Sequence, residues 1–324
     1  MKTGNHIEWE DFIRFADLEC QNFEMTGMWY DLHNYNLENY DRRIAFVDYR
    51  PLMDFTKNKF YNEDLKNRIN YLKSKKFTIV FVNLWECKKF HNSDNEIIWA
   101  GDVSFFWYKM YHRYKNKKFK FNHVQKPYDF LYLNKSKRSH RDLLFDKLVE
   151  KNILSNSLYS YIFRKINLKT EYELPQFRNS VYPLYGNDRD IFEPPFNSTK
   201  FNIVSETTVH DEAFITEKTW KPIIAGQIFI IHGKRNHLND LKSLGFRSYE
   251  KFIDESYDDI ESLQKRTDAI VKLCNELKDK SHIKLYADTK EIREHNQKIF
   301  FSEQHCKNAC QITLKNLFKL IDSR

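Results

Sequence analysis

FNIVSETTVHDEAFITEKTWKPIIAGQIFIIHG, residues 201–233, contains two apolar segments separated by a polar segment and a helical one. Residues 201–204 and 227–232 have the composition of buried parallel strands, and residues 215–225 between them are typical of a connecting helix. A strand, a helix and a second strand in this order form the βαβ unit of an open sheet. The stretch therefore predicts an α/β fold.

The same alternation of strands and helices continues toward both ends of the chain. Strands are expected at residues 44–49, 78–84, 96–101 and 128–133, and helices at 63–74, 103–114, directly after 134–139, at 238–244, 259–277 and 307–321. Gly245 is expected to follow the helix at 238–244 as its C′ glycine. Residues 169–200 contain most of the prolines and are expected to form a long surface connection.

The length of 324 residues favours two domains. We place the boundary between residues 1–150 and 151–324, because each half has its own strand-and-helix pattern and a proline-bearing connection follows. Ligands of such folds bind at sheet ends and between domains. The sequence therefore predicts two Rossmann-like domains that face a cleft.

Composition limits the function classes. Aromatic residues make up 16% and apolar residues 41%, which is enough for sizeable cores and excludes a disordered chain. A net charge of +8 and a pI near 9.0 favour an anionic partner, which leaves nucleotide sugars, nucleic acids and acidic surfaces open. Basic residues gather at 115–120 and 135–141, and the first run is also typical of an ordinary solvated face.

Several other features are absent from the sequence or ambiguous. The five cysteines are scattered, which favours reduced thiols, and Cys306 and Cys310 beside His305 fit a helix face better than a zinc site. Neither a signal peptide nor a run of roughly 18 apolar residues is present, so we expect a cytoplasmic protein. A Walker loop and a GxGxxG motif are also missing, so ATPase and dehydrogenase activities are not supported.

The chemistry-bearing part of residues 201–233 is the end of the first strand and the start of the helix. Glu206 ends the strand, Thr216 marks the helix start, and Glu217 and Lys218 lie in the first turn. Amides at a helix start and a nearby Lys favour a diphosphate, while a carboxylate accepts hydrogen bonds from ribose hydroxyls. An ordinary exposed helix start is the alternative.

This segment resembles the donor-binding motif of the α1,3-fucosyltransferase family and of related phage and bacterial glycosyltransferases. In that family a strand ends in Phe-Glu-Asn, and a loop leads to Tyr-Ile-Thr-Glu-Lys with Trp two positions on. The tetrapeptide 215–218 matches, and Trp220 has the same offset. Thr207 and Phe214 replace the family's Asn and Tyr, the loop is one residue longer, and Asp211 lies near the acidic position.

The resemblance also implies roles for residues outside this segment. The family has an Arg at a helix start, seven residues before a Leu, which reaches the donor phosphates; Arg141 matches, with Arg138 as the substitute and a solvated basic turn as the alternative. A looser match makes Glu86, after the strand at 78–84, the base of an inverting transfer. Glu96 and Asp102 are its rivals, and Glu86 is also typical of a surface acid.

Taken with the resemblance, the residues predict a GT-B glycosyltransferase with an acceptor-side domain at 1–150 and a nucleotide-sugar-binding domain at 151–324. Lys218 and Arg141 would bind the diphosphate, Glu217 the ribose, and Glu206 would order the loop or the base pocket. The implied donor is GDP-fucose or another nucleotide sugar, no metal is required, and the acceptor is a glycan or another hydroxyl. A modified DNA base as acceptor, a non-catalytic nucleic-acid-binding protein and a lectin-like subunit stay open as alternatives.

Overall fold

The structure is a computed structural model, and it describes residues 44–48, 53–54, 59–60, 70, 74, 78–82, 96–99, 103–121, 126–166, 191–209 and 215–322. The chain forms two compact units, of which the larger is Met110–His305 and the smaller combines Met1–Lys109 with Cys306–Arg324. The boundary predicted at residue 150 falls inside the larger unit, between elements that share one sheet.

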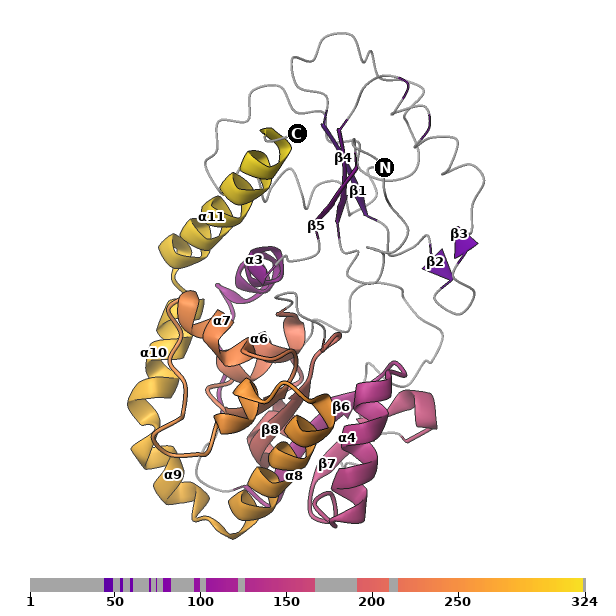
Figure 1. Cartoon of the computed structure of the whole chain (residues 1–324). Coiled ribbons are helices and arrows are strands. Elements are labelled where there is room, and N and C mark those ends of the chain that lie inside the picture. The colour runs from indigo at the N-terminus through magenta and orange to yellow at the C-terminus, as the bar shows by residue number, and fades with distance from the viewer. Residues whose placement is uncertain are drawn as a thin grey trace. The chain divides into compact units, whose positions relative to one another are not determined.

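The smaller unit contains a three-stranded parallel sheet in the order β1-β4-β5 and a separate antiparallel pair, β2 and β3 (Figure 1). Their bounds are β1 Ile44–Asp48, β2 Met53–Asp54, β3 Lys59–Phe60, β4 Thr78–Val82 and β5 Glu96–Trp99. The helices α3 Val103–Tyr114 and α11 Glu303–Asp322 each extend from one unit into the other. The structure confirms the strands predicted near β1, β4 and β5, and it confirms the helices predicted at 103–114 and 307–321. The helix expected at 63–74 lies almost wholly outside the described residues.

The larger unit is built on a four-stranded sheet in the order β7-β6-β8-β9, in which every pairing is parallel. The strands are β6 Tyr128–Asn134, β7 Leu158–Tyr161, β8 Thr199–Ser205 and β9 Ile228–His232. The helices are α4 Ser139–Glu150, α5 Glu193–Ser198, α6 Glu217–Ile224, α7 His237–Ser243, α8 Leu263–Asp279, α9 His282–Asp288 and α10 Lys290–Phe300. The prediction of an α/β fold is confirmed, and the sheet is compatible with a Rossmann-like fold.

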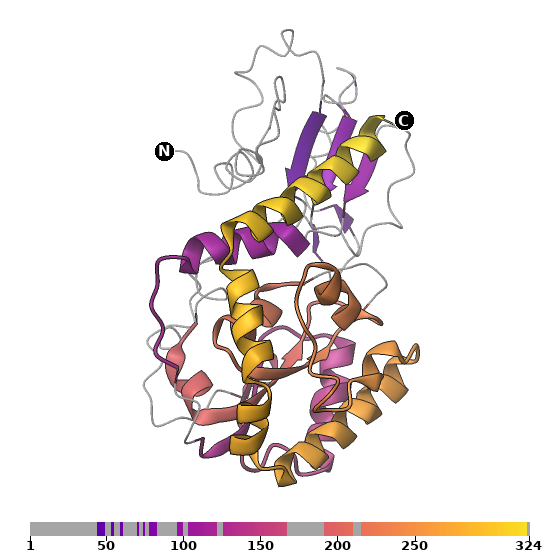
Figure 2. The same cartoon turned by 90° about the vertical axis from the view of Figure 1, so that its left-hand side faces the viewer.

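Helices cover both faces of this sheet, as Figures 1 and 2 show. On one face, Tyr132 of β6 stacks on Phe145 of α4 with ring centroids 6.5 Å apart. On the other face, Leu131 joins a buried cluster with Phe196 of α5 and Ala225 at the end of α6. Burial on both sides explains why residues 130–132 of β6 and 228–231 of β9 are apolar without alternation.

The end of α6 is closed by α10. Gly226 follows the helix with a φ of +60°, and an added Cβ there would come within 2.9 Å of Gln297 Nε2. Gln297 Nε2 donates to the carbonyl of Ile224 at 2.8 Å, and Arg293 Nη1 donates to that of Gly226 at 3.2 Å. Long side chains from α10 thus satisfy carbonyls that the end of a helix leaves without partners.

Three details concern the sequence-based expectations. Residues 169–200 are expected to form a connection, but their last part contains helix α5 and the first residues of β8. Helix α5 accommodates Pro194 and Pro195 because proline is tolerated in the first turn of a helix. Helix α8 begins later than predicted, at Leu263, since Ser262 caps it. Gly245 follows α7 with a φ of +93°, as expected of a C′ glycine.

Among the helices of the described ranges, none combines the length and apolar composition that a bilayer span requires.

Candidate functional site

The path of the chain through the larger sheet reverses direction between β6 and β8. From β6 the chain continues to β7 at one edge, whereas from β8 it continues to β9 at the other edge. Such a topological switch point is where open α/β sheets bind their ligands, at the carboxyl ends of the strands. The two segments that carry the sequence motif, residues 134–141 and 206–218, follow directly on these two strand ends.

Glu206 comes directly after β8 and is fully buried. Its Oε1 accepts hydrogen bonds from Thr216 N at 3.1 Å and from Thr219 Oγ1 at 2.7 Å. Its Oε2 accepts from Thr216 Oγ1 at 2.6 Å and from Thr207 N at 3.2 Å. Four donors therefore surround the carboxylate, which offsets the cost of removing a charge from water. The carboxylate of Glu206 is thus hydrogen-bonded to the start of α6.

The backbone carbonyl of Glu206 connects the same residue to α4. His140 Nε2 lies 2.9 Å from this oxygen, and Arg141 Nη2 donates to it at 3.0 Å. Arg141 Nη2 also lies 3.4 Å from the carbonyl of Ser205. The first turn of α4 is thus hydrogen-bonded to the end of β8, across the switch point.

Arg141 is a buried cation whose hydrogen-bond partners are backbone carbonyls. Its side chain is 3% exposed, and its third carbonyl partner is Ser136, at 3.2 Å from Nη1. Nε has no hydrogen-bond partner, and no ion pair with a carboxylate is found within the described residues. Burial lowers the pKa of the guanidinium, while the charges of Glu206 and Glu217 oppose that shift. The loop that follows β6 therefore encloses a positive charge without a direct counter-ion.

The start of α6 holds the three consecutive residues of the motif. Thr216 is the N-cap, and its hydroxyl accepts from Lys218 N at 3.4 Å. Lys218 Nζ contacts Glu217 Oε1 at 2.6 Å, Thr216 Oγ1 at 3.2 Å and Thr207 Oγ1 at 3.2 Å. Burial alone would raise the pKa of Glu217, but the ammonium groups of Lys218 and Lys221 outweigh it and lower this pKa to about 2. Glu217 is accordingly an anion at neutral pH.

A row of polar residues at the strand ends was not recognised in the sequence. Ser205 of β8 pairs with His232 of β9, whose Nε2 lies 3.0 Å from Thr267 Oγ1 of α8. Because the Thr267 hydroxyl donates to a carbonyl at 2.7 Å, His232 Nε2 is the donor in this contact. Its Nδ1 is then a buried acceptor, and burial holds the pKa of His232 well below its usual value. The sequence signal, one His after an apolar run, is common in ordinary cores.

The remaining predicted residues are placed as follows. Arg138 is the half-buried N-cap residue of α4, at the same end of the sheet as Arg141. Glu86, its rival Asp102 and the acidic residue Asp211 lie outside the described residues, and Glu96 begins β5. The structure therefore places the residues predicted to bind the donor at one end of the larger sheet and gives no geometry for the expected base.

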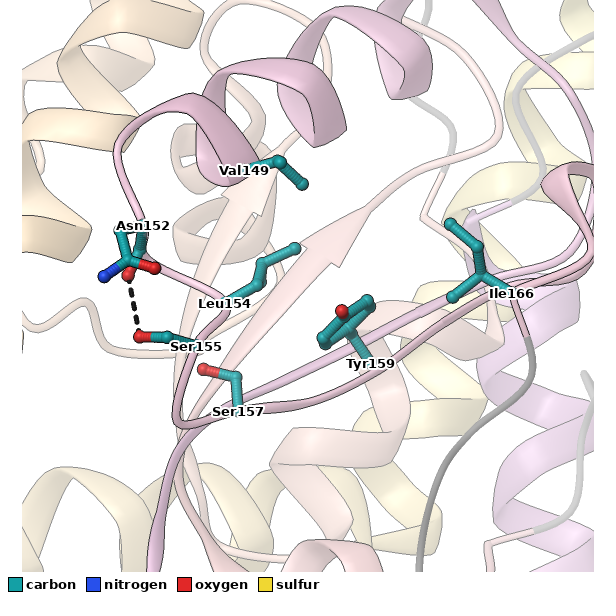
Figure 3. Close-up of a pocket in the computed structure, with 7 residues that line it drawn as sticks. All are labelled: Val149, Asn152, Leu154, Ser155, Ser157, Tyr159 and Ile166. Carbon is teal, nitrogen blue, oxygen red and sulfur yellow. Dashed lines mark hydrogen bonds between the residues drawn. The ribbon is translucent and has the colours of Figure 1, made fainter.

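A cavity of about 350 Å³ lies elsewhere in the larger unit, where the turn after α4 leads into β7 (Figure 3). Its lining is apolar with a few hydroxyl and amide groups, from Val149, Asn152, Leu154, Ser155, Ser157, Tyr159 and Ile166. Most of these residues lie at or before the amino end of β7 and Ile166 follows its carboxyl end, whereas Glu206 follows the carboxyl end of β8. None of the residues that line the cavity is an Asp, Glu, His, Cys, Lys or Arg.

No cluster of metal-ligating side chains is found in the part of the chain that the structure describes. Cys306 and Cys310 both lie buried on α11.

No family model matches the sequence, and no curated protein matches it.

Proposed function

We propose that this chain is a GT-B glycosyltransferase that binds a nucleotide sugar at the switch point between β6 and β8. The sugar passes to a glycan or another hydroxyl acceptor. Each of the two units has a parallel sheet, which supports the two Rossmann-like domains of that architecture.

One observation carries the proposal. The two segments that match the glycosyltransferase motifs are far apart in sequence, yet His140 and Arg141 of the first are hydrogen-bonded to Glu206 of the second. A chance match of two short strings gives no reason for them to meet at the ligand-binding end of one sheet.

The donor side follows from the charges at this end of the sheet. Lys218 is about a quarter exposed, so its ammonium can turn to a diphosphate without leaving the site. The start of α4 has no side-chain cap on its amides, and Arg138 and Arg141 add positive charge beside it. The start of a helix and nearby cations together favour phosphate oxygens. Glu217, an anion at neutral pH, accepts hydrogen bonds from the ribose.

The acceptor side rests on Glu86. In a single inverting displacement this carboxylate removes the proton of the acceptor hydroxyl while the nucleoside diphosphate leaves. The cations of the donor site stabilise the charge that develops on the diphosphate, so no metal is required. GDP-fucose is the donor that the motif favours, with other nucleotide sugars as rivals.

Binding of nucleic acid without catalysis has less support from the described residues. The basic run at 115–120 is exposed, but the aromatic residues just before it, Tyr111 and Tyr114, are buried in α3. Sequence-independent binding of single strands uses exposed aromatic rings on which bases stack.

A ligand screen tests the donor site. GDP, UDP, ADP and CDP are added in turn, and the melting temperature of the full chain is measured. A nucleotide that binds the folded state at a hundredfold excess over its Kd stabilises it by about 2.7 kcal/mol, so at least one should raise the melting temperature. If none of the four does so, the proposed donor site is rejected.

Lys218→Ala then tests the motif itself. Losing a charge-assisted contact costs roughly 1.5–3 kcal/mol, so the affinity for the stabilising nucleotide should fall about tenfold to a hundredfold by calorimetry. Lys272→Ala is the control, because Lys272 lies on α8 with its side chain 78% exposed. Equal affinities of the Lys218 variant and the wild type would remove Lys218 from the site.

A further inference from the structure

Two hydrogen-bonded links join the first turn of α4 to the first turn of α6, and Glu206 lies between them. The Glu206 carbonyl is 2.9 Å from His140 Nε2, and its carboxylate accepts from Thr216 N at 3.1 Å and Thr219 Oγ1 at 2.7 Å. Lys218 Nζ in turn contacts the Thr216 hydroxyl at 3.2 Å. The position of Glu206 therefore also sets the position of the ammonium group.

His140 is a well-defined donor in this chain of contacts. A carbonyl oxygen accepts hydrogen bonds and never donates them, so the Nε2 of His140 must have a hydrogen. The ring is buried, and its centroid lies 5.7 Å from that of His232. Since His232 is itself hydrogen-bonded to Thr267 of α8, packing from that helix restricts how far the His140 ring can move.

Arg141 also donates to Glu206, but it divides its contacts among three carbonyls, those of Ser136, Ser205 and Glu206. Replacing it would disturb the loop, the strand and a buried charge together. His140 can be replaced with a narrower effect, because its hydrogen bond to Glu206 can be removed without removing a fixed charge.

We propose that His140 is a positioning residue, which fixes the Glu206 peptide and through it the start of α6, including Lys218. Its importance for nucleotide binding rests on the proposed function, but its effect on α6 does not. Displacing binding groups by about 1 Å is enough to weaken a site markedly.

The experiment compares three variants of the full chain. His140→Leu keeps the bulk and removes the donor, whereas His140→Gln places an amide N–H near the position of Nε2. His295→Leu is the matched control, since His295 Nε2 of α10 lies 2.9 Å from the carbonyl of Gly245, which follows α7, and not at the start of α6. Hydrogen–deuterium exchange of peptides covering 215–224 is read first, and the affinity for the nucleotide that stabilises the wild type is read second.

In His140→Leu, exchange at the start of α6 should rise about fivefold to tenfold, the factor that one net hydrogen bond is worth. His140→Gln should restore exchange to near the wild-type rate, and His295→Leu should leave this segment unchanged. Nucleotide affinity should fall about tenfold in the Leu variant and recover in the Gln variant.

Unchanged exchange at 215–224 in His140→Leu would overturn the proposal, and so would an equal rise in every peptide or in both His140 variants. If the Leu variant does not fold, His140→Asn takes its place, because this amide is too short to reach the carbonyl. If the wild type binds none of the nucleotides, the proposed function fails while the exchange result still decides the role of His140.

Discussion

At the residue scale, Glu206 and Arg141 are a buried anion and a buried cation that do not form an ion pair with each other. The carboxylate of Glu206 is surrounded by amides and hydroxyls, and the guanidinium of Arg141 by carbonyls. Each charge is thus stabilised by dipoles that the fold holds in place. Removing the partners of either one would leave a buried charge without compensation, which is strongly destabilising in proteins.

Glu86→Gln is expected to lower turnover by about 10²–10⁴-fold, the usual contribution of a positioned base. The substitution keeps the shape of the side chain and removes its basicity, so nucleotide affinity should remain close to that of the wild type. Steady-state kinetics and calorimetry measure the two quantities separately.

Near wild-type turnover in Glu86→Gln would reject this base, and Glu96→Gln and Asp102→Asn would then be compared. A product with retained anomeric configuration would reject the single displacement itself, since that mechanism inverts the configuration.

The sequence allowed some of these residues to be predicted and not others. Thr216, Glu217 and Lys218 are adjacent, so a short motif located them together at a helix start. The contact between Arg141 and Glu206 depends on the pairing of β6 with β8, which no local pattern specifies. His140 and His232 gave no signal, because single histidines on apolar faces are ordinary core residues.

At the element scale, the connection between α7 and α8 contains Glu255, whose carboxyl group is buried in a way that disfavours its charged form. Oε1 of Glu255 accepts from Tyr249 N at 3.1 Å, while its Oε2 is buried without a hydrogen-bond partner. Burial raises the pKa of Glu255 from 4.5 to about 7. The folded state thus holds this proton at pH values where the unfolded chain has released it, so stability falls as pH rises from about 4.5 to 7.

Glu255→Gln should therefore stabilise the protein at pH 8, by on the order of 1–3 kcal/mol, and have little effect at pH 4. The amide oxygen can still accept from Tyr249 N. Urea denaturation at the two pH values measures the difference. Glu250→Gln is the control, because the ion pair with Lys242 lowers the pKa of Glu250 and the variant should gain no stability. A stability gain that is equal at both pH values would contradict the expected cause.

The elements themselves could be predicted where the apolar pattern was long. Helix α3 was predicted with the bounds that it has, whereas β7, with four residues, was missed. Helix α10 was missed for another reason, since Arg293 and Asn296 occupy part of its buried face. Arg293 donates to Gly226 and Asn296 to Arg247, so partners distant in sequence make those positions suitable for polar residues.

At the scale of the whole molecule, the proposed transfer should continue in EDTA. In the proposed site, Lys218, Arg138 and Arg141 would supply the positive charge that a metal brings to the leaving diphosphate in other enzymes. The assay follows release of nucleoside diphosphate from the matching nucleotide sugar, with and without chelator. Complete loss of release in EDTA that manganese restores would contradict a metal-independent reaction.

The pairing of β6 with β8 also has a consequence for how the molecule folds. The units β6-α4-β7 and β8-α6-β9 are each held by neighbours in sequence, whereas Phe130 meets Phe201 only after a long stretch of chain has been closed into a loop. Local units form quickly and long-range pairings form late, because closing a loop costs entropy before its contacts repay it. We therefore expect the two halves of the candidate site to form separately at first, one on β6-α4-β7 and the other on β8-α6-β9. The site is completed in the same step that joins the sheet, and no partly folded form should bind the ligand.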